Sequence, residues 1–162
     1  MKTLDWPAVT YRLFAIGNIL VVVVGLLFLL PTAWGVGVAD MKNVPANSHF
    51  ATWFWAMASI NVVFLAMLVV ASVHLFRLKP SGITICNAVF VGEMIYFFLI
   101  GFLWFASPKP VSMGVGAATG IGNTGLSPQL ISAYPLVALV CLNVARWKRA
   151  KTHSITTAAT LC

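Results

Sequence analysis

The chain has 162 residues, of which 60% are hydrophobic and only 8% are charged, whereas soluble domains carry about 25% charged residues. So few charges cannot cover a surface that faces water on all sides, which excludes an ordinary soluble domain and predicts one compact membrane domain over residues 1–151. The net charge of +7 does not indicate nucleic acid, because the basic residues flank apolar segments, as the positive-inside rule requires.

Four apolar stretches approach the roughly 20 residues that are needed to cross the hydrocarbon core of a bilayer. Backbone groups in lipid must be hydrogen-bonded within the segment, so each stretch is predicted to be an α-helix. The expected fold is an all-α membrane protein, an antiparallel bundle of four transmembrane helices with spans at about residues 13–30, 51–75, 83–105 and 129–145.

The first stretch follows Lys2 and Arg12, and a cleaved secretory signal is the alternative to a retained span. Its apolar run of roughly 18 residues is longer than the apolar core of a signal peptide, which has about 7–15 residues. We therefore expect a retained span. The connection over residues 31–50 is expected to be an outer loop. Residues 76–82 contain Pro80 and Gly82, which favour a tight turn between two antiparallel helices.

Glu93 is the only acidic residue inside an apolar stretch. A carboxylate at that depth costs about 2.5–3.5 kcal/mol or more, so it is a candidate functional site. Cys86 and Tyr96 fall near the same face of the predicted helix, because seven residues are about two turns and three are a neighbour spacing. Asn61 has a similar depth in the second stretch. We expect Glu93, Asn61 and Tyr96 to form an intramembrane polar site.

Burial disfavours the charged form of a carboxyl, so we expect a protonated, neutral Glu93. Such a group could carry a proton or bind a cation. It could equally hold helices together through hydrogen bonds, as polar residues do in membrane bundles. Pairing with a basic residue on another protein is the third possibility.

A second polar layer is expected towards the cytoplasm, formed by Asn18, His74, Asn87 and Asn143. His74, Cys86 and Cys141 could approach one another, but no residues have the spacing of a recognised zinc site. A haem held by two histidines needs both at a matched depth, which the three histidines do not offer. We therefore predict no metal and no cofactor.

The second outer connection, about residues 106–127, lacks the preceding strand that a nucleotide-binding fingerprint needs. We expect it to line an external cleft, to form a docking surface, or to be only a connector; its glycines are Gly114, Gly116, Gly120, Gly122 and Gly125. Ser127 and Pro128 favour the start of the fourth helix. Within that helix Pro135 removes one backbone hydrogen bond, which predicts a kink.

Eight of the ten Lys and Arg residues lie on one side of the predicted spans, and only Lys42 and Lys109 lie on the other. This asymmetry predicts that both termini are cytoplasmic. The basic segment 146–151 is expected to attract anionic lipid headgroups, and residues 152–162 are expected to be a short disordered tail. Trp6 and Trp147 fall at the inner boundary, where aromatic belts occur.

The three acidic residues are too few and too dispersed for acid–base catalysis. We therefore expect a non-catalytic accessory or assembly subunit, or a homo-oligomer, in a bacterial inner membrane. It would act through helix–helix and outer-loop contacts with other membrane subunits or with itself. The alternatives are a small proton- or cation-linked carrier or channel that uses Glu93, and a membrane enzyme or cofactor-binding subunit.

Overall fold

The computed structural model describes residues 5–42, 49–106 and 128–160, and every regular element within these ranges is helical. The expected all-α class is therefore confirmed for this part of the chain. The elements in order are α1 (Trp6–Val24), the π-helical turn η1 (Gly25–Leu29), α2 (Leu30–Met41), α3 (Phe50–Phe76), α4 (Pro80–Ala106) and α7 (Pro128–Thr160).

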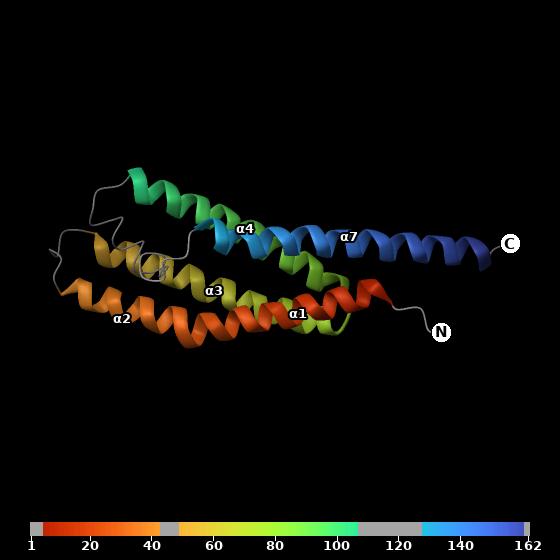
Figure 1. The fold of residues 1–162 in the computed structure, drawn as a ribbon, viewed down its shortest axis with the longest axis horizontal. Coiled ribbons are helices and arrows are strands. Elements are labelled where there is room, and N and C mark those ends of the chain that lie inside the picture. Colours follow the sequence, from red (N-terminus) through yellow and green to blue (C-terminus); the bar gives the residue numbers. More distant parts are fainter. Residues whose placement is uncertain (1–4, 43–48, 107–127, 161–162) are drawn as a thin grey trace.

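Two of the described helical segments are long and apolar enough to cross a membrane, namely Trp6–Leu27 and α3. The helices lie side by side, and both ends of the chain lie at the same end of the molecule (Figure 1). Helix α1 packs against α3 and α7, and α4 packs against the same two helices. The C-terminal part of α7 projects beyond the other helices (Figure 1).

The turn between α3 and α4 has the tight geometry that its sequence predicts. Leu78 adopts a left-handed conformation with φ of 54°. The amide of Lys79 donates to the carbonyl of His74 at 2.9 Å, which closes the end of α3. Gly82 then passes so close to α3 that a Cβ atom there would lie 2.8 Å from the backbone nitrogen of Leu75. The glycine thus allows α3 and α4 to begin their contact directly after the turn.

The structure differs from the sequence-based expectation in two connections. Residues 30–41 form α2, so most of the segment expected to be an outer loop is helical. Pro31 lacks the amide that would bond one turn back, yet it stands in the first turn of α2, just after the π-helical turn η1. At the other end, α7 continues to Thr160 through the segment expected to be a disordered tail. No glycine or proline follows Pro135 to stop the helix.

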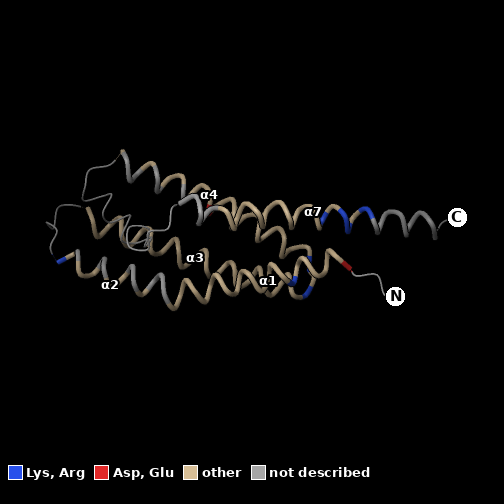
Figure 2. The backbone as a smooth tube through the Cα atoms, viewed as in Figure 1, with Lys and Arg blue, Asp and Glu red and all other residues tan. Residues whose placement is uncertain are grey.

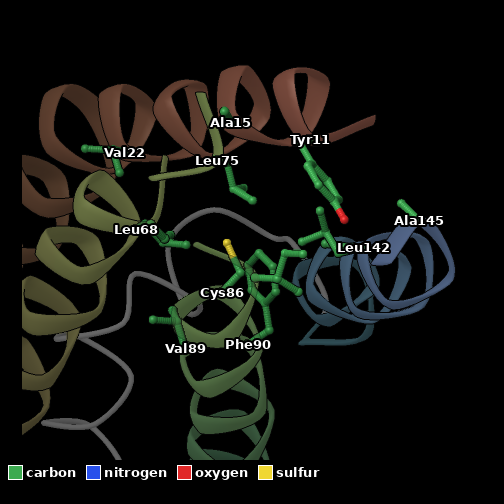
Figure 3. Close-up of a cluster of buried hydrophobic side chains, with 13 residues drawn as sticks. Tyr11, Ala15, Val22, Leu68, Leu75, Cys86, Val89, Phe90, Leu142 and Ala145 are labelled. Atoms are coloured by element: carbon green, nitrogen blue, oxygen red, sulfur yellow. The ribbon is translucent and has the colours of Figure 1, made fainter. Parts of the chain in front are cut away.

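The main core lies where α1, α3, α4 and α7 meet, and Cys86 stands at its centre (Figure 3). Ala15, Leu68 and Leu142 contribute fully buried side chains from the three helices around it. Alanines at these contacts let helix backbones approach closely, as is common in membrane bundles. A second cluster of buried side chains packs the other end of the α3–α4 pair and consists of Phe50, Phe54, Met57, Ala58 and Tyr96.

Candidate functional site

The polar centre of the bundle is a chain of two hydrogen bonds that joins three helices. The Tyr134 hydroxyl on α7 donates to Oδ1 of Asn18 on α1 at 2.6 Å. Nδ2 of Asn18 donates to the thiol sulfur of Cys86 on α4 at 3.4 Å. Asn18 has none of its surface exposed. A buried side-chain amide is costly when it has no hydrogen-bond partner. The oxygen and the nitrogen of the Asn18 amide both have a partner on a neighbouring helix.

Aromatic packing holds Tyr134 in the position that this hydrogen bond requires. Its ring meets that of Phe90 edge-on, with centroids 5.8 Å apart, and that of Phe14 at 6.4 Å. Gly17 lies beneath the hydroxyl, and a Cβ atom at this position would be 2.8 Å from the oxygen. The absence of a side chain at Gly17 is therefore what lets Tyr134 reach Asn18.

Glu93 is half-buried on the face of α4 that carries Cys86, as the seven-residue spacing predicts. Its carboxyl lies within electrostatic range of the Cys86 thiol and the Tyr134 hydroxyl. No side chain among the residues that the structure describes donates a hydrogen bond to it. Glu93 thus borders the Asn18–Tyr134–Cys86 cluster without being one of its hydrogen-bonded members.

Tyr96 and Asn61 form a separate contact between α3 and α4. The Tyr96 hydroxyl donates to the backbone carbonyl of Met57 at 3.2 Å, and the Asn61 side chain hydrogen-bonds to the same tyrosine. The Tyr96 ring packs edge-on against Phe64 at 5.7 Å. The expected group of Glu93, Asn61 and Tyr96 is therefore divided. Three residues fall about 60° short of a full helical turn, so Tyr96 contacts α3 while Glu93 borders the cluster formed with α1 and α7.

The expected inner polar layer is likewise divided into separate contacts. His74 Nδ1 lies 2.8 Å from Ser81 Oγ across the α3–α4 turn. Asn87 and Asn143 exchange two hydrogen bonds of 3.0 and 3.1 Å between α4 and α7. Asn18 belongs to the Tyr134 and Cys86 cluster. Each of these residues thus joins one particular set of helices, and they do not form a single site.

Sequence reasoning singled out Asn18 and Cys86 but did not predict Tyr134 as their partner. A signal was present in the Gly17–Asn18 pair, which combines a small residue with a buried amide and so favours a close helix contact. Pro135 lies inside α7, next to Tyr134, and the helix continues through it, so the kink stays a prediction. The glycine-rich segment 113–127 lies outside the described residues.

No group of three His, Cys, Asp or Glu side chains in residues 5–42, 49–106 and 128–160 is arranged to hold a metal ion. Cys86 and Cys141 are free thiols, and Cys86 is buried. Basic side chains instead distinguish one end of the molecule. Figure 2 shows most of the described Lys and Arg residues gathered towards the end of the molecule that carries both termini.

The architecture and the polar cluster together define a class: an all-helical protein with two described segments able to span a membrane. Comparisons with family models, curated proteins and solved structures find no match for this chain.

Proposed function

We propose that this chain is a four-span integral membrane protein of the bacterial inner membrane, with both termini cytoplasmic, that serves as a non-catalytic subunit. It would assemble with other membrane proteins or with copies of itself. One observation supports this proposal above the others: several polar side chains form hydrogen bonds from one helix to another. Asn18, Asn87, Asn143 and Tyr96 each form at least one hydrogen bond to a different helix.

The membrane placement is supported by the surface and by the charges. Helix α4 has 27 residues, the same length as α3, which is itself a candidate span. Its outward side chains include Ile95 and Phe98, which are 64% and 79% exposed. Large exposed apolar groups in such numbers are typical of a surface that contacts lipid or another protein. The basic end of the bundle would then face the cytoplasm.

The proposed contact surface is the outward stripe of α4, which comprises Val91, Ile95, Phe98 and Phe102. Their spacing of four, three and four residues places them along one side of the helix, as in the seam of two paired helices. The stripe includes two aromatic rings, which are large contact groups in protein interfaces. A helix of another subunit, or α4 of a second copy, would pack along it.

Native mass spectrometry of protein gently solubilised from its own membrane tests this proposal. A defined complex is expected, containing either other polypeptides or copies of this chain. Phe98→Ala should weaken the complex, whereas Val140→Ala on the exposed side of α7 should leave it intact. A monomer in wild type and variants alike would overturn the assembly role.

A small proton- or cation-linked carrier is the second candidate, and one observation favours it. The Glu93 carboxyl lies within electrostatic range of the Tyr134 hydroxyl and the Cys86 thiol, and no described side chain donates a hydrogen bond to it. An intramembrane acid of this kind is typical of proton relays and ion pathways. Flux of protons or monovalent cations into vesicles that contain the purified protein tests this role directly.

A further inference from the structure

A pocket of about 300 Å³ lies at the basic end of the bundle, between α1, the α3–α4 turn and α7. Three polar side chains face it, namely Tyr11 from α1 and Arg146 and Arg149 from α7. Its apolar wall comes from Leu78, Pro80, Ile83 and Ala150. None of the described lining residues is acidic. The pocket therefore combines two guanidinium groups and a phenol with an apolar wall.

One of the two arginines that line the pocket, Arg149, is held by its neighbours. Arg149 donates from Nη1 to the carbonyl of Leu78 at 3.4 Å. Its guanidinium lies 5.9 Å from the centre of the Tyr11 ring, within electrostatic range of the Tyr11 hydroxyl. Arg146 lies within electrostatic range of the same hydroxyl and forms no hydrogen bond to the described residues. The positive charges of Arg146 and Arg149 therefore both act on the Tyr11 hydroxyl.

The acid that acts electrostatically on Tyr11 is Asp5, which precedes α1. Its carboxylate accepts a hydrogen bond of 3.4 Å from the amide of Ala8 and so caps the helix. Asp5 does not line the pocket. The charge that the pocket presents is therefore positive.

We infer that this pocket binds the phosphodiester of one anionic phospholipid from the membrane leaflet at the basic end. Arginine forks match phosphate oxygens with paired hydrogen bonds, and the Tyr11 hydroxyl offers a further donor. The volume is at the lower end of ligand sites, which suits a headgroup and not a whole lipid. Ile83 and Leu78 would face the beginning of an acyl chain.

The position favours a lipid over a soluble phosphate. Tyr11, Ile83 and Arg146 lie at the inner ends of three predicted spans, which is the depth of the headgroups. Trp6 lies at the same end, with the ammonium of Lys148 4.5 Å from its ring centre. This pairing suits the membrane interface. The inference rests on the proposed membrane placement.

The test uses the full-length protein in a neutral detergent, titrated with phosphatidylglycerol, phosphatidylcholine or inorganic phosphate, with binding followed by native mass spectrometry. Phosphatidylglycerol should be retained as a single molecule, and phosphatidylcholine should not. Arg146→Gln should weaken retention by at least about tenfold, as expected when a charged hydrogen bond is lost. Arg12→Gln, which removes one charge from the same end outside the pocket, should leave retention unchanged.

Arg149→Gln should give a similar loss, but it also removes the bond to Leu78, so Arg146→Gln is the decisive variant. Equal losses of lipid retention in Arg146→Gln and Arg12→Gln would show that the basic end attracts the lipid diffusely, which contradicts a specific site in the pocket. Displacement of the lipid by millimolar inorganic phosphate would show that the pocket binds a soluble anion, which contradicts the proposed lipid ligand. A protein found in membranes yet without preference for phosphatidylglycerol would refute only this inference. A protein recovered without membranes would refute the proposed membrane function as well.

Discussion

The hydroxyl of Tyr134 on α7 donates a 2.6 Å hydrogen bond to the side-chain oxygen of Asn18 on α1, across 116 positions of sequence. The bond joins the first and last helices of the described bundle. Because Asn18 also reaches Cys86 on α4, its amide links three helices at one depth. The consequences of this relationship can be measured on the folded protein.

Tyr134→Phe should destabilise the fold by about 1 kcal/mol. The variant keeps the ring contacts with Phe14 and Phe90 but leaves the Asn18 oxygen buried without its donor. Thermal unfolding in detergent measures the change. A double-mutant cycle with Asn18→Leu provides the control, because Tyr134→Phe should cost much less once Asn18 is absent. Equal costs in both backgrounds would show that the hydrogen bond contributes nothing.

Gly17→Ala should destabilise the protein by about 1–3 kcal/mol, because the new Cβ atom would meet the Tyr134 hydroxyl oxygen at 2.8 Å. Tyr134→Phe should partly rescue this variant, since the ring carbons stand back at 3.5 Å. Gly35→Ala in α2 is the matched control: its Cβ would meet nothing within 4 Å, so stability should be unchanged or slightly raised. Melting temperatures of the four proteins decide the matter.

Asn87→Leu should cost about 0.5–1 kcal/mol, because Asn143 loses its two bonds across the α4–α7 contact. The double variant Asn87→Leu with Asn143→Leu should cost less than the sum of the single changes, since no amide is then left without its partner. Unfolding free energies in detergent test the comparison. Strictly additive losses would mean that the two amides do not interact.

Glu93→Gln should leave expression and assembly intact if the residue only packs helices, because glutamine keeps the shape and hydrogen-bonding capacity of a neutral acid. If the chain is a carrier, the same variant should abolish proton- or cation-linked flux in vesicles while the protein stays folded. Asp5→Asn, an acid outside the apolar segments that can still cap α1, is the control for flux. Flux that survives Glu93→Gln would exclude the carrier mechanism proposed for this residue.

Local chemistry accounts for the features that could be predicted. Pro80 and Gly82 predict the turn between α3 and α4. Proline restricts the backbone and glycine frees it, and both effects are local to the residue. The glycine-free, proline-free segment after Pro135 carried a local signal for continued helix, but its small polar residues led to the expectation of a disordered tail. Residues 31–41 were expected to belong to a loop, but they are helical and follow the π-helical turn η1.

The sequence by itself determined the helical class and the charged end, because composition and the positions of Lys and Arg do not depend on how helices pack. Only the tertiary structure decided which polar groups meet, as when Tyr96 pairs with Asn61 and Tyr134 with Asn18. The apolar segments are hydrophobic on all sides, so the pattern does not show which face turns inward. Rotation of each helix about its axis is set by side-chain packing between helices, and this contact information is absent from any single segment.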